Sequence, residues 1–229
     1  MPPQFDLSGS WESLLQRDKV LLERTLPIYL QGRSWFTGWN RQISNVTVIE
    51  SLRLGDAPAE VMLTLARVEY TEGEPEMYAL PIAFEKEQRA SEIRSWYPHA
   101  VIALVRTPGH DSANGVLYDA LVDPQRAAAV LESFEKGHRA RGPAGEVVAS
   151  AARSLRTAGT SLEPRALRSE HTSAAVVYGE QYLLKFFRRM GEGMSPELEL
   201  GRILGEGAPE ANLPRVVGAI EYRSGRGEP

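Results

Sequence analysis

The chain has 229 residues, of which 42% are hydrophobic and 24% are charged, an ordinary composition for a water-soluble globular protein. Its formal charge of −4 argues against nucleic acid as a partner, and the absence of cysteine excludes disulfide and thiolate chemistry. No apolar run approaches the roughly 18–20 residues of a membrane span, and no signal peptide is recognisable, so we expect no membrane contact and a cytoplasmic location.

The first part of the chain shows one helix followed by three strands. Residues 11–26 have apolar positions at helical spacing, and Pro27 is expected to end or restart this helix. Strands are predicted at 43–54, 59–70 and 76–84, separated by short turns that contain Gly and Pro. Such short connections favour an antiparallel meander that packs against the leading helix.

A charged segment at 85–89 is the expected boundary between a first domain, residues 1–88, and a second domain, residues 89–229. The second domain is also expected to mix helices with a mostly antiparallel sheet. Its predicted elements are strands at 100–106, 115–121, 174–178, 181–187 and 215–222 and helices at 123–134, 146–156 and 196–205. The predicted fold class is therefore α+β.

A single lysine in an apolar stretch is the most informative feature of the chain. Lys185 lies in the predicted strand 181–187, and Glu199 lies in the helix that follows. A strand lysine and a helix glutamate are how protein kinases hold the phosphates of ATP. In the alternative interpretation, Lys185 only extends its ammonium to water, and Glu199 pairs with Arg202 on the same helix. The apolar positions of that helix are expected to form its buried face: Leu200, Ile203 and Leu204.

An aromatic loop lies between the first helix and the first strand of the meander. It contains Trp35, Phe36 and Trp39 beside two arginines, Arg33 and Arg41. Two interpretations are open: the rings stack on sugars or bases, or they form an aromatic cluster that fixes the helix to the sheet. The second is favoured, because large rings in such loops are usually part of the core.

Several segments make the chain resemble the N-terminal part of bacterial maltokinases, which are often fused to trehalose synthase. They are Arg33-Ser34-Trp35-Phe36-Thr37-Gly38, Tyr78-Ala79-Leu80-Pro81-Ile82, Leu117-Tyr118-Asp119-Ala120-Leu121 and Leu184-Lys185-Phe186-Phe187-Arg188-Arg189, the last continuing into Pro196-Glu197-Leu198-Glu199-Leu200-Gly201-Arg202. They occur in the order found in the family and span most of the chain, which makes the set more specific than any one segment.

The resemblance implies a cystatin-like cap at residues 1–88, followed by the N-lobe of a kinase related to aminoglycoside phosphotransferases. The family transfers the γ-phosphoryl group of ATP to maltose, giving maltose 1-phosphate. By position, Lys185 would contact the ATP phosphates and Glu199 would pair with Lys185. Thr172 and Ser173 would lie in the turn over the phosphates. That turn reads roughly Ser-Asn-Thr-Ser in the family but Thr172-Ser173-Ala174-Ala175 here, which leaves more of the contact to backbone N–H groups.

The catalytic parts of such a kinase are not evident in the sequence. None of the four histidines begins a His-x-Asp motif, and no second acid for Mg²⁺ and no cluster with metal-ligand spacing is recognisable. We therefore expect a C-lobe outside this sequence to bind Mg²⁺, and no phosphoryl transfer by this chain alone. The expected partners are ATP, maltose, that C-lobe and a trehalose synthase domain. The alternative is a non-catalytic module whose cap packs against a trehalose synthase or a kinase C-lobe.

Overall fold

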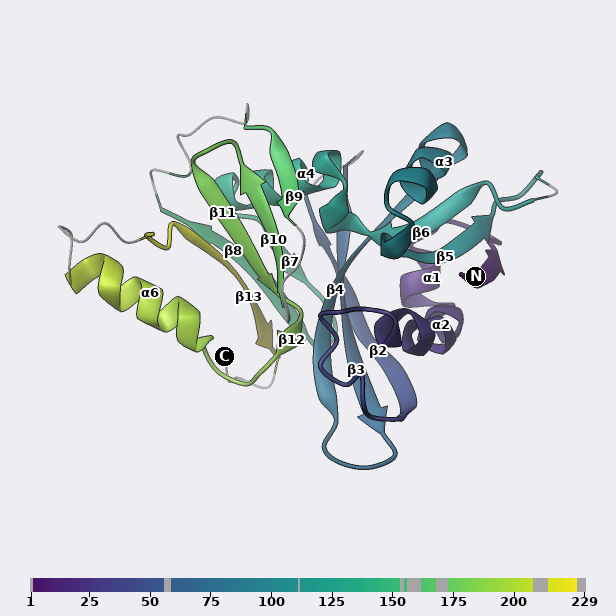
Figure 1. Cartoon of the computed structure of the whole chain (residues 1–229), viewed down its shortest axis with the longest axis horizontal. Helices are drawn as coiled ribbons and strands as arrows, with labels where there is room; N and C mark the ends of the chain where they lie inside the picture. The colour runs from purple at the N-terminus through teal and green to yellow at the C-terminus, as the bar shows by residue number, and fades with distance from the viewer. Residues whose placement is uncertain are drawn as a thin grey trace.

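Figure 1 shows the computed structural model of the chain. The structure describes residues 2–55, 59–110, 112–152, 155, 162–167, 173–207 and 214–225. It is an α+β fold with one large, curled, mostly antiparallel sheet and two small antiparallel sheets, which confirms the predicted fold class. None of the helices within these residues is long and apolar enough to span a bilayer.

The large sheet contains the meander predicted from the sequence. Its strands in the described residues are β1 (Gln4–Asp6), β2 (Ile43–Leu54), β3 (Val61–Tyr70), β4 (Glu76–Lys86), β5 (Val101–Arg106), β6 (Gly115–Asp119) and β12 (Arg189–Met190). The order is β1-β5-β6-β4-β3-β2, and β12 pairs with β4 beside the end of β6. Only β1 and β5 are parallel, so the predicted antiparallel meander of β2, β3 and β4 is confirmed.

Two small sheets are built from strands that follow β6 in the chain. Their strands are β7 (Arg139–Arg141), β8 (Gly145–Ala151), β9 (Pro164–Leu167), β10 (Ser173–Tyr178), β11 (Tyr182–Phe187) and β13 (Gly218–Ser224). They are arranged as β13-β8-β7 and β11-β10-β9. In Figure 1 both lie on one side of the large sheet, and β12 stands where the two parts of the molecule meet.

The helices in the described residues are α1 (Ser13–Gln16), α2 (Lys19–Gln31), α3 (Glu87–Trp96), α4 (Pro124–Glu135) and α6 (Pro196–Gly207), with 3-10 turns η1 (Pro98–Ala100) and η2 (Ala120–Val122). Helices α1 to α4 cover the large sheet on both faces, whereas α6 lies beside β13, away from that sheet (Figure 1). One buried cluster lies between the sheet and α1 and α2, and a second joins the opposite face to α3, α4 and the small sheets. This double coverage explains why the first six residues of β3 are all buried instead of alternating.

The first predicted helix differs from the observed one in two ways. The expected helix at 11–26 is divided into α1 and α2, and Pro27 lies inside α2 instead of ending it. Tyr29 and Leu30, just after the proline, are buried in the core beneath the helix. Their packing offsets the backbone hydrogen bond that a proline removes from a helix interior.

The predicted helix at 146–156 is wrong for residues 146–151, although Leu155 is helical. Residues 145–151 form β8, which pairs with β13 over seven residues and with β7 on its other side. Val147 and Val148 are buried in β8. Alanine-rich composition favours a helix locally, but a strand inserted between two neighbours buries these β-branched side chains and pairs the backbone on both edges.

The charged segment at 85–89 does not interrupt the structure. It forms the end of β4 and the start of α3, which buries Ala90 and Ile93. The boundary expected between residues 88 and 89 falls inside α3, and the large sheet continues beyond it through β5 and β6. The division of the chain into two domains stays a prediction.

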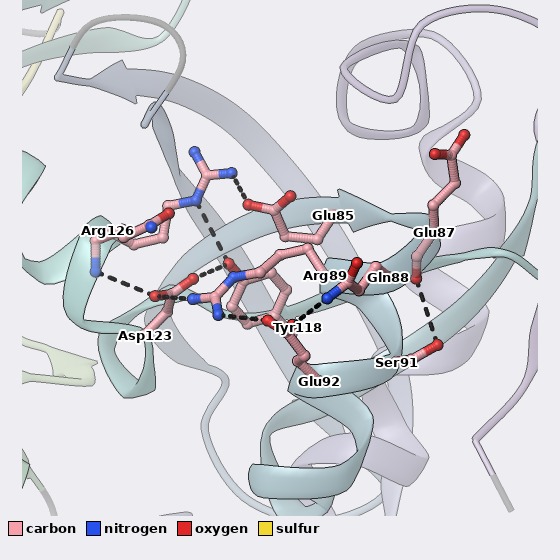
Figure 2. Close-up of polar contacts among 10 residues, drawn as sticks. Glu85, Glu87, Gln88, Arg89, Ser91, Glu92, Tyr118, Asp123 and Arg126 are labelled. Atoms are coloured by element: carbon pink, nitrogen blue, oxygen red, sulfur yellow. Dashed lines mark hydrogen bonds and ion pairs between the residues drawn. The ribbon is translucent and has the colours of Figure 1, made fainter.

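A buried polar network fastens α3 and α4 to the sheet (Figure 2). Asp123, which is fully buried, caps α4 by accepting a hydrogen bond of 3.1 Å from the Gln125 backbone N–H. The same carboxylate accepts from Arg89 at 2.7 Å and from the Tyr118 hydroxyl at 2.7 Å. Burial and the nearby Asp123 charge raise the pKa of Tyr118, so its phenol stays protonated and donates. Beside it, Arg126 forms an ion pair with Glu85.

Candidate functional site

The predicted lysine strand is one arm of a hairpin. β10 and β11 are antiparallel and are joined by a turn that begins at Gly179, whose φ of 55° lies in the left-handed region that glycine favours. Lys185 stands directly opposite Ala175, and Ser173 stands opposite Phe187. The strand pair and its turn are therefore confirmed. Thr172 lies outside the described residues.

Alternation along the hairpin gives it two different faces. On β11, Tyr182, Leu184 and Phe186 are half-buried, whereas Leu183 and Lys185 are exposed, with 62% of Leu183 accessible. Because cross-strand neighbours share a face, the outer face of the hairpin gathers the exposed β11 side chains with every second residue of β10. We name this outer face by its members: Ser173, Ala175, Val177, Leu183, Lys185 and Phe187.

Helix α6 supplies the partner of Lys185. The Lys185 ammonium forms an ion pair with the carboxylate of Glu197, and it lies 5.1 Å from the centroid of the Phe187 ring. Successive helix residues turn by about 100°, so Glu197 and Glu199 point in opposite directions and only one faces β11. Glu199 is exposed, and its backbone N–H donates to Ser195 O at 2.9 Å, as expected for a helix that starts after Ser195. The pair expected for Glu199 is thus formed by Glu197.

Two other expectations for α6 differ from the structure. Arg202 pairs with Glu221 of β13 at 3.7 Å, so the described residues do not show the expected Glu199–Arg202 pair. The stripe of Leu200, Ile203 and Leu204 is exposed, and its predicted burial is wrong. Helix α6 approaches its neighbour with a different side from the one expected. A β-carbon at Gly201 would collide with Val216, so the helix makes its close contact through the side that carries Gly201.

The aromatic loop forms most of the predicted cluster. Trp35 and Phe36 are buried, with the Phe36 ring 5.2 Å and the Trp35 ring 6.3 Å from the ring of Tyr78 on β4. For these two rings, the favoured interpretation of an aromatic cluster that packs on the sheet is confirmed. Trp39 lies outside the cluster, with 73% of its surface exposed.

The aromatic loop and the strands around it match a known protein family. Residues 29–123, from the end of α2 to the residue that caps α4, match the family model of the maltokinase N-terminal cap domain. This part of the chain is a maltokinase N-terminal cap domain. The cap domain therefore includes the aromatic loop and strands β2 to β6, and it extends past the boundary expected at residue 88.

The hairpin with Lys185 lies outside the matched residues but is attached to the cap domain. Strand β12, which follows β11 after a single residue, pairs with β4 of the cap domain. Two neighbouring arginines, Arg188 and Arg189, reach acids of the cap domain, Asp119 and Glu76. These acids and Glu197 were not foreseen from the sequence. The arginines were visible in the sequence as a basic segment, but their partners are far away in the chain.

Glu76 is the centre of a polar cluster at the start of β4. It accepts hydrogen bonds of 2.7 Å from the hydroxyls of Tyr70 and Tyr78, and it pairs with Arg41 and Arg189, each at 3.2 Å. Burial alone would raise the pKa of Glu76, but these hydroxyls and guanidinium groups outweigh it and lower that pKa below its ordinary value. Glu76 is therefore ionised in the folded protein near neutral pH.

This arrangement predicts a pH-dependent contribution of Glu76 to stability. Because the pKa of Glu76 is lower in the folded than in the unfolded protein, its ionisation stabilises the fold when the pH is above the unfolded-state pKa of about 4.3. That stabilisation is lost as the pH falls through the lowered pKa. Urea unfolding should therefore show Glu76→Gln less stable than the natural protein at pH 7, with the difference shrinking under acid conditions. The control is Glu69→Gln, an exposed carboxylate 3.5 Å from Arg67. A difference between Glu76→Gln and the natural protein that does not change with pH would contradict the assignment.

Proposed function

We propose that this chain supplies the cap and the ATP-binding part of a maltokinase-like sugar kinase, which phosphorylates maltose to maltose 1-phosphate. The observation that carries the proposal is the Lys185–Glu197 ion pair, formed by a strand and a helix that come later in the chain than the maltokinase cap domain and are attached to it through β12. A lysine on a strand, held by a glutamate on a helix, is the arrangement that positions nucleotide phosphates in kinases.

The surroundings of Lys185 suit a phosphate ligand. Its side chain is 44% exposed, so the ammonium is open to a ligand, and the adjacent Leu183 and Phe187 form an apolar surface beside it. An ammonium has three donors that rotate freely and therefore serves as an adaptable point charge for phosphate oxygens. Ser173 lies two residues from Ala175, the residue opposite Lys185, and its hydroxyl and backbone belong to the same end of the hairpin.

The residues of this chain would bind and orient ATP, and other parts of the protein would complete the reaction. Mg²⁺ supplies charge neutralisation at the phosphates when bound, and the 229 residues offer neither a His-x-Asp base nor an evident acid for it. Lys185 would neutralise phosphate charge, and Glu197 would hold the ammonium in place. The kinase C-lobe and the sugar site belong to the rest of the enzyme in this proposal.

The two glutamates of α6 provide a matched comparison. We expect Glu197→Gln to lower kcat/KM for ATP by about 3- to 10-fold, because a neutral amide holds an ammonium less firmly than a carboxylate. Glu199→Gln, two residues away and also exposed, should change kcat/KM by less than about 2-fold. The measurement is initial-rate kinetics of the complete natural protein with varied ATP. A larger effect of Glu199→Gln would return the positioning role to Glu199.

The function itself is tested by sugar-dependent ATP consumption. The complete natural protein should consume ATP in the presence of maltose, and the 229-residue chain alone should not. Maltose 1-phosphate, detected by phosphorus NMR, should accumulate in step with ADP. Absence of turnover with maltose and with every other disaccharide would overturn the proposal.

A second candidate function is a non-catalytic interaction module. The observation that favours it is the exposed apolar stripe of Leu200, Ile203 and Leu204 on α6, which is typical of a surface that another protein part covers. A trehalose synthase domain and a kinase C-lobe are the partners considered from the sequence. Sugar-dependent ATP turnover by the complete natural protein decides between the two candidates, because a non-catalytic module would not produce it.

A further inference from the structure

The chain passes from the lysine hairpin to the cap domain within three residues of Lys185. β11 ends at Phe187, and β12 begins at Arg189 and pairs with β4, with Arg189 opposite Tyr78 and Met190 opposite Met77. Between them, the carbonyl of Arg188 accepts a hydrogen bond of 2.8 Å from the Ala79 N–H. The backbone after Lys185 is therefore part of the cap sheet.

Arg188 fixes this passage from inside the protein. It is only 3% exposed, and its guanidinium lies 2.5 Å from the Asp119 carboxylate, which is also buried. The guanidinium carbon lies 4.7 Å from the centroid of the Trp35 ring and 5.5 Å from that of Phe186. A guanidinium is weakly hydrated and stacks on ring faces, so it suits this buried position between an acid and two rings.

Asp119 belongs to the cap domain on the other side of this contact. It ends β6, and its carboxylate accepts from the Leu121 N–H at 3.2 Å and from the Tyr29 hydroxyl at 3.4 Å. These contacts hold the carboxylate between α2 and η2, where it faces Arg188. Removal of either member of a buried ion pair leaves the other charge uncompensated, which makes such pairs costly to break.

Arg189 makes the second, weaker attachment. Its guanidinium lies 3.2 Å from Glu76, whose carboxylate is also bound by Arg41 and two tyrosines, and about half of the Arg189 side chain is exposed. Because ion pairs at the surface contribute little, Arg189 should add less than Arg188.

We propose that Arg188 and Arg189 are positioning residues for Lys185: they fix the lysine strand to the cap domain, so that the cap determines where the ammonium meets the nucleotide. The inference rests on the proposed function for its catalytic consequence. Phe186, which follows Lys185 and packs on Arg188, is the direct link between the two sites. Detachment of β12 from β4 would leave the lysine end of β11 without its support.

The test compares three arginine variants of the complete natural protein. Arg188→Met removes the buried charge, and Arg189→Ala removes the exposed one. The matched control is Arg53→Ala, because Arg53 of β2 also lies 3.2 Å from a glutamate, Glu60, and its exposed fraction of 51% is close to the 55% of Arg189.

Two measurements are made on each variant: amide hydrogen exchange without nucleotide, and kinetics with ATP and maltose varied separately. We expect exchange in 186–190 to be faster in Arg188→Met, with β2 and β3 unchanged. kcat/KM for ATP should fall on the order of 100-fold in Arg188→Met and about 5-fold in Arg189→Ala. KM for ATP should rise while KM for maltose stays unchanged, whereas general unfolding would lower the apparent kcat and leave both KM values unchanged.

The outcomes separate this inference from the proposed function. If Arg188→Met and Arg189→Ala match Arg53→Ala in exchange and kinetics while Lys185→Ala loses activity, the positioning role is overturned and the kinase function stands. If Lys185→Ala retains full activity, the proposed function fails, and the positioning role fails with it. If Arg188→Met does not fold, the half-exposed Arg189 carries the test, and an unchanged kcat/KM for ATP in Arg189→Ala overturns the inference.

Discussion

Replacement of Lys185 by alanine is expected to lower maltose-dependent ATP turnover on the order of 100-fold or more. Positioning and charge neutralisation provide nearly all the catalysis in phosphoryl transfer, so the loss of one cationic phosphate contact is severe. The stability of the variant should be almost unchanged, because the Lys185–Glu197 pair is largely solvated, with exposed fractions of 44% and 60%. The measurement is steady-state kinetics together with urea unfolding.

Lys136 provides the matched control for this variant. It is an exposed lysine that directly follows α4 and forms an ion pair with Glu132 at 3.2 Å. Lys136→Ala should keep turnover within about 2-fold of the natural protein, since surface pairs of this kind contribute little. Equal rates for Lys185→Ala and Lys136→Ala would remove Lys185 from the mechanism.

The second large effect concerns stability. Asp123→Ala is expected to lower the free energy of unfolding by about 3 kcal/mol, since it removes a helix cap and leaves buried donors without their acceptor. The donors are the Tyr118 hydroxyl, the Arg89 guanidinium and the Gln125 N–H, each of which bonds the Asp123 carboxylate at 3.1 Å or less. Such a loss is a large share of the roughly 5–15 kcal/mol that stabilises an ordinary domain. Urea unfolding measures it.

Two further variants separate the cap from the network. Asp123→Ser keeps an N-cap oxygen, so it should recover about 1 kcal/mol of the loss. Glu92→Ala removes a partner of Arg89 at the surface, 3.0 Å away and partly exposed, and should cost less than about 1 kcal/mol. A loss below about 1 kcal/mol in Asp123→Ala itself would show that the buried network contributes little.

The strands of the cap could be predicted because their signals are local. β2, β3 and β4 alternate or run apolar between turns with Gly and Pro, and a hairpin-length connection leaves room only for antiparallel pairing. The same holds for β10 and β11, whose turn begins at Gly179. The α+β fold class and the place of Lys185 in a strand follow from this pattern, whereas its exposure does not.

The contacts that define the candidate site could not be predicted because they depend on distant segments. Arg188 meets Asp119 across 69 positions of the chain, and no periodicity in the sequence connects them. The choice between Glu197 and Glu199 depends on the rotation of α6, which Gly201 and its contact with Val216 influence. The sequence shows that the apolar residues of α6 lie on one side of the helix. It does not show whether another element of the structure covers that side.

The proposed kinase function depends most on Lys185 as the residue that meets the nucleotide phosphates. An acyl-phosphate derivative of ATP tests this directly, because a lysine amine beside the terminal phosphate attacks the acyl carbon and releases ATP. The 229-residue sequence contains four lysines, Lys19, Lys86, Lys136 and Lys185, and mass spectrometry reads the labelling of each of them. We predict acylation of Lys185 in the complete natural protein, suppressed by excess ATP, with no suppression at the other three. Labelling of Lys185 that ATP does not suppress, or labelling confined to the other lysines, would contradict the account.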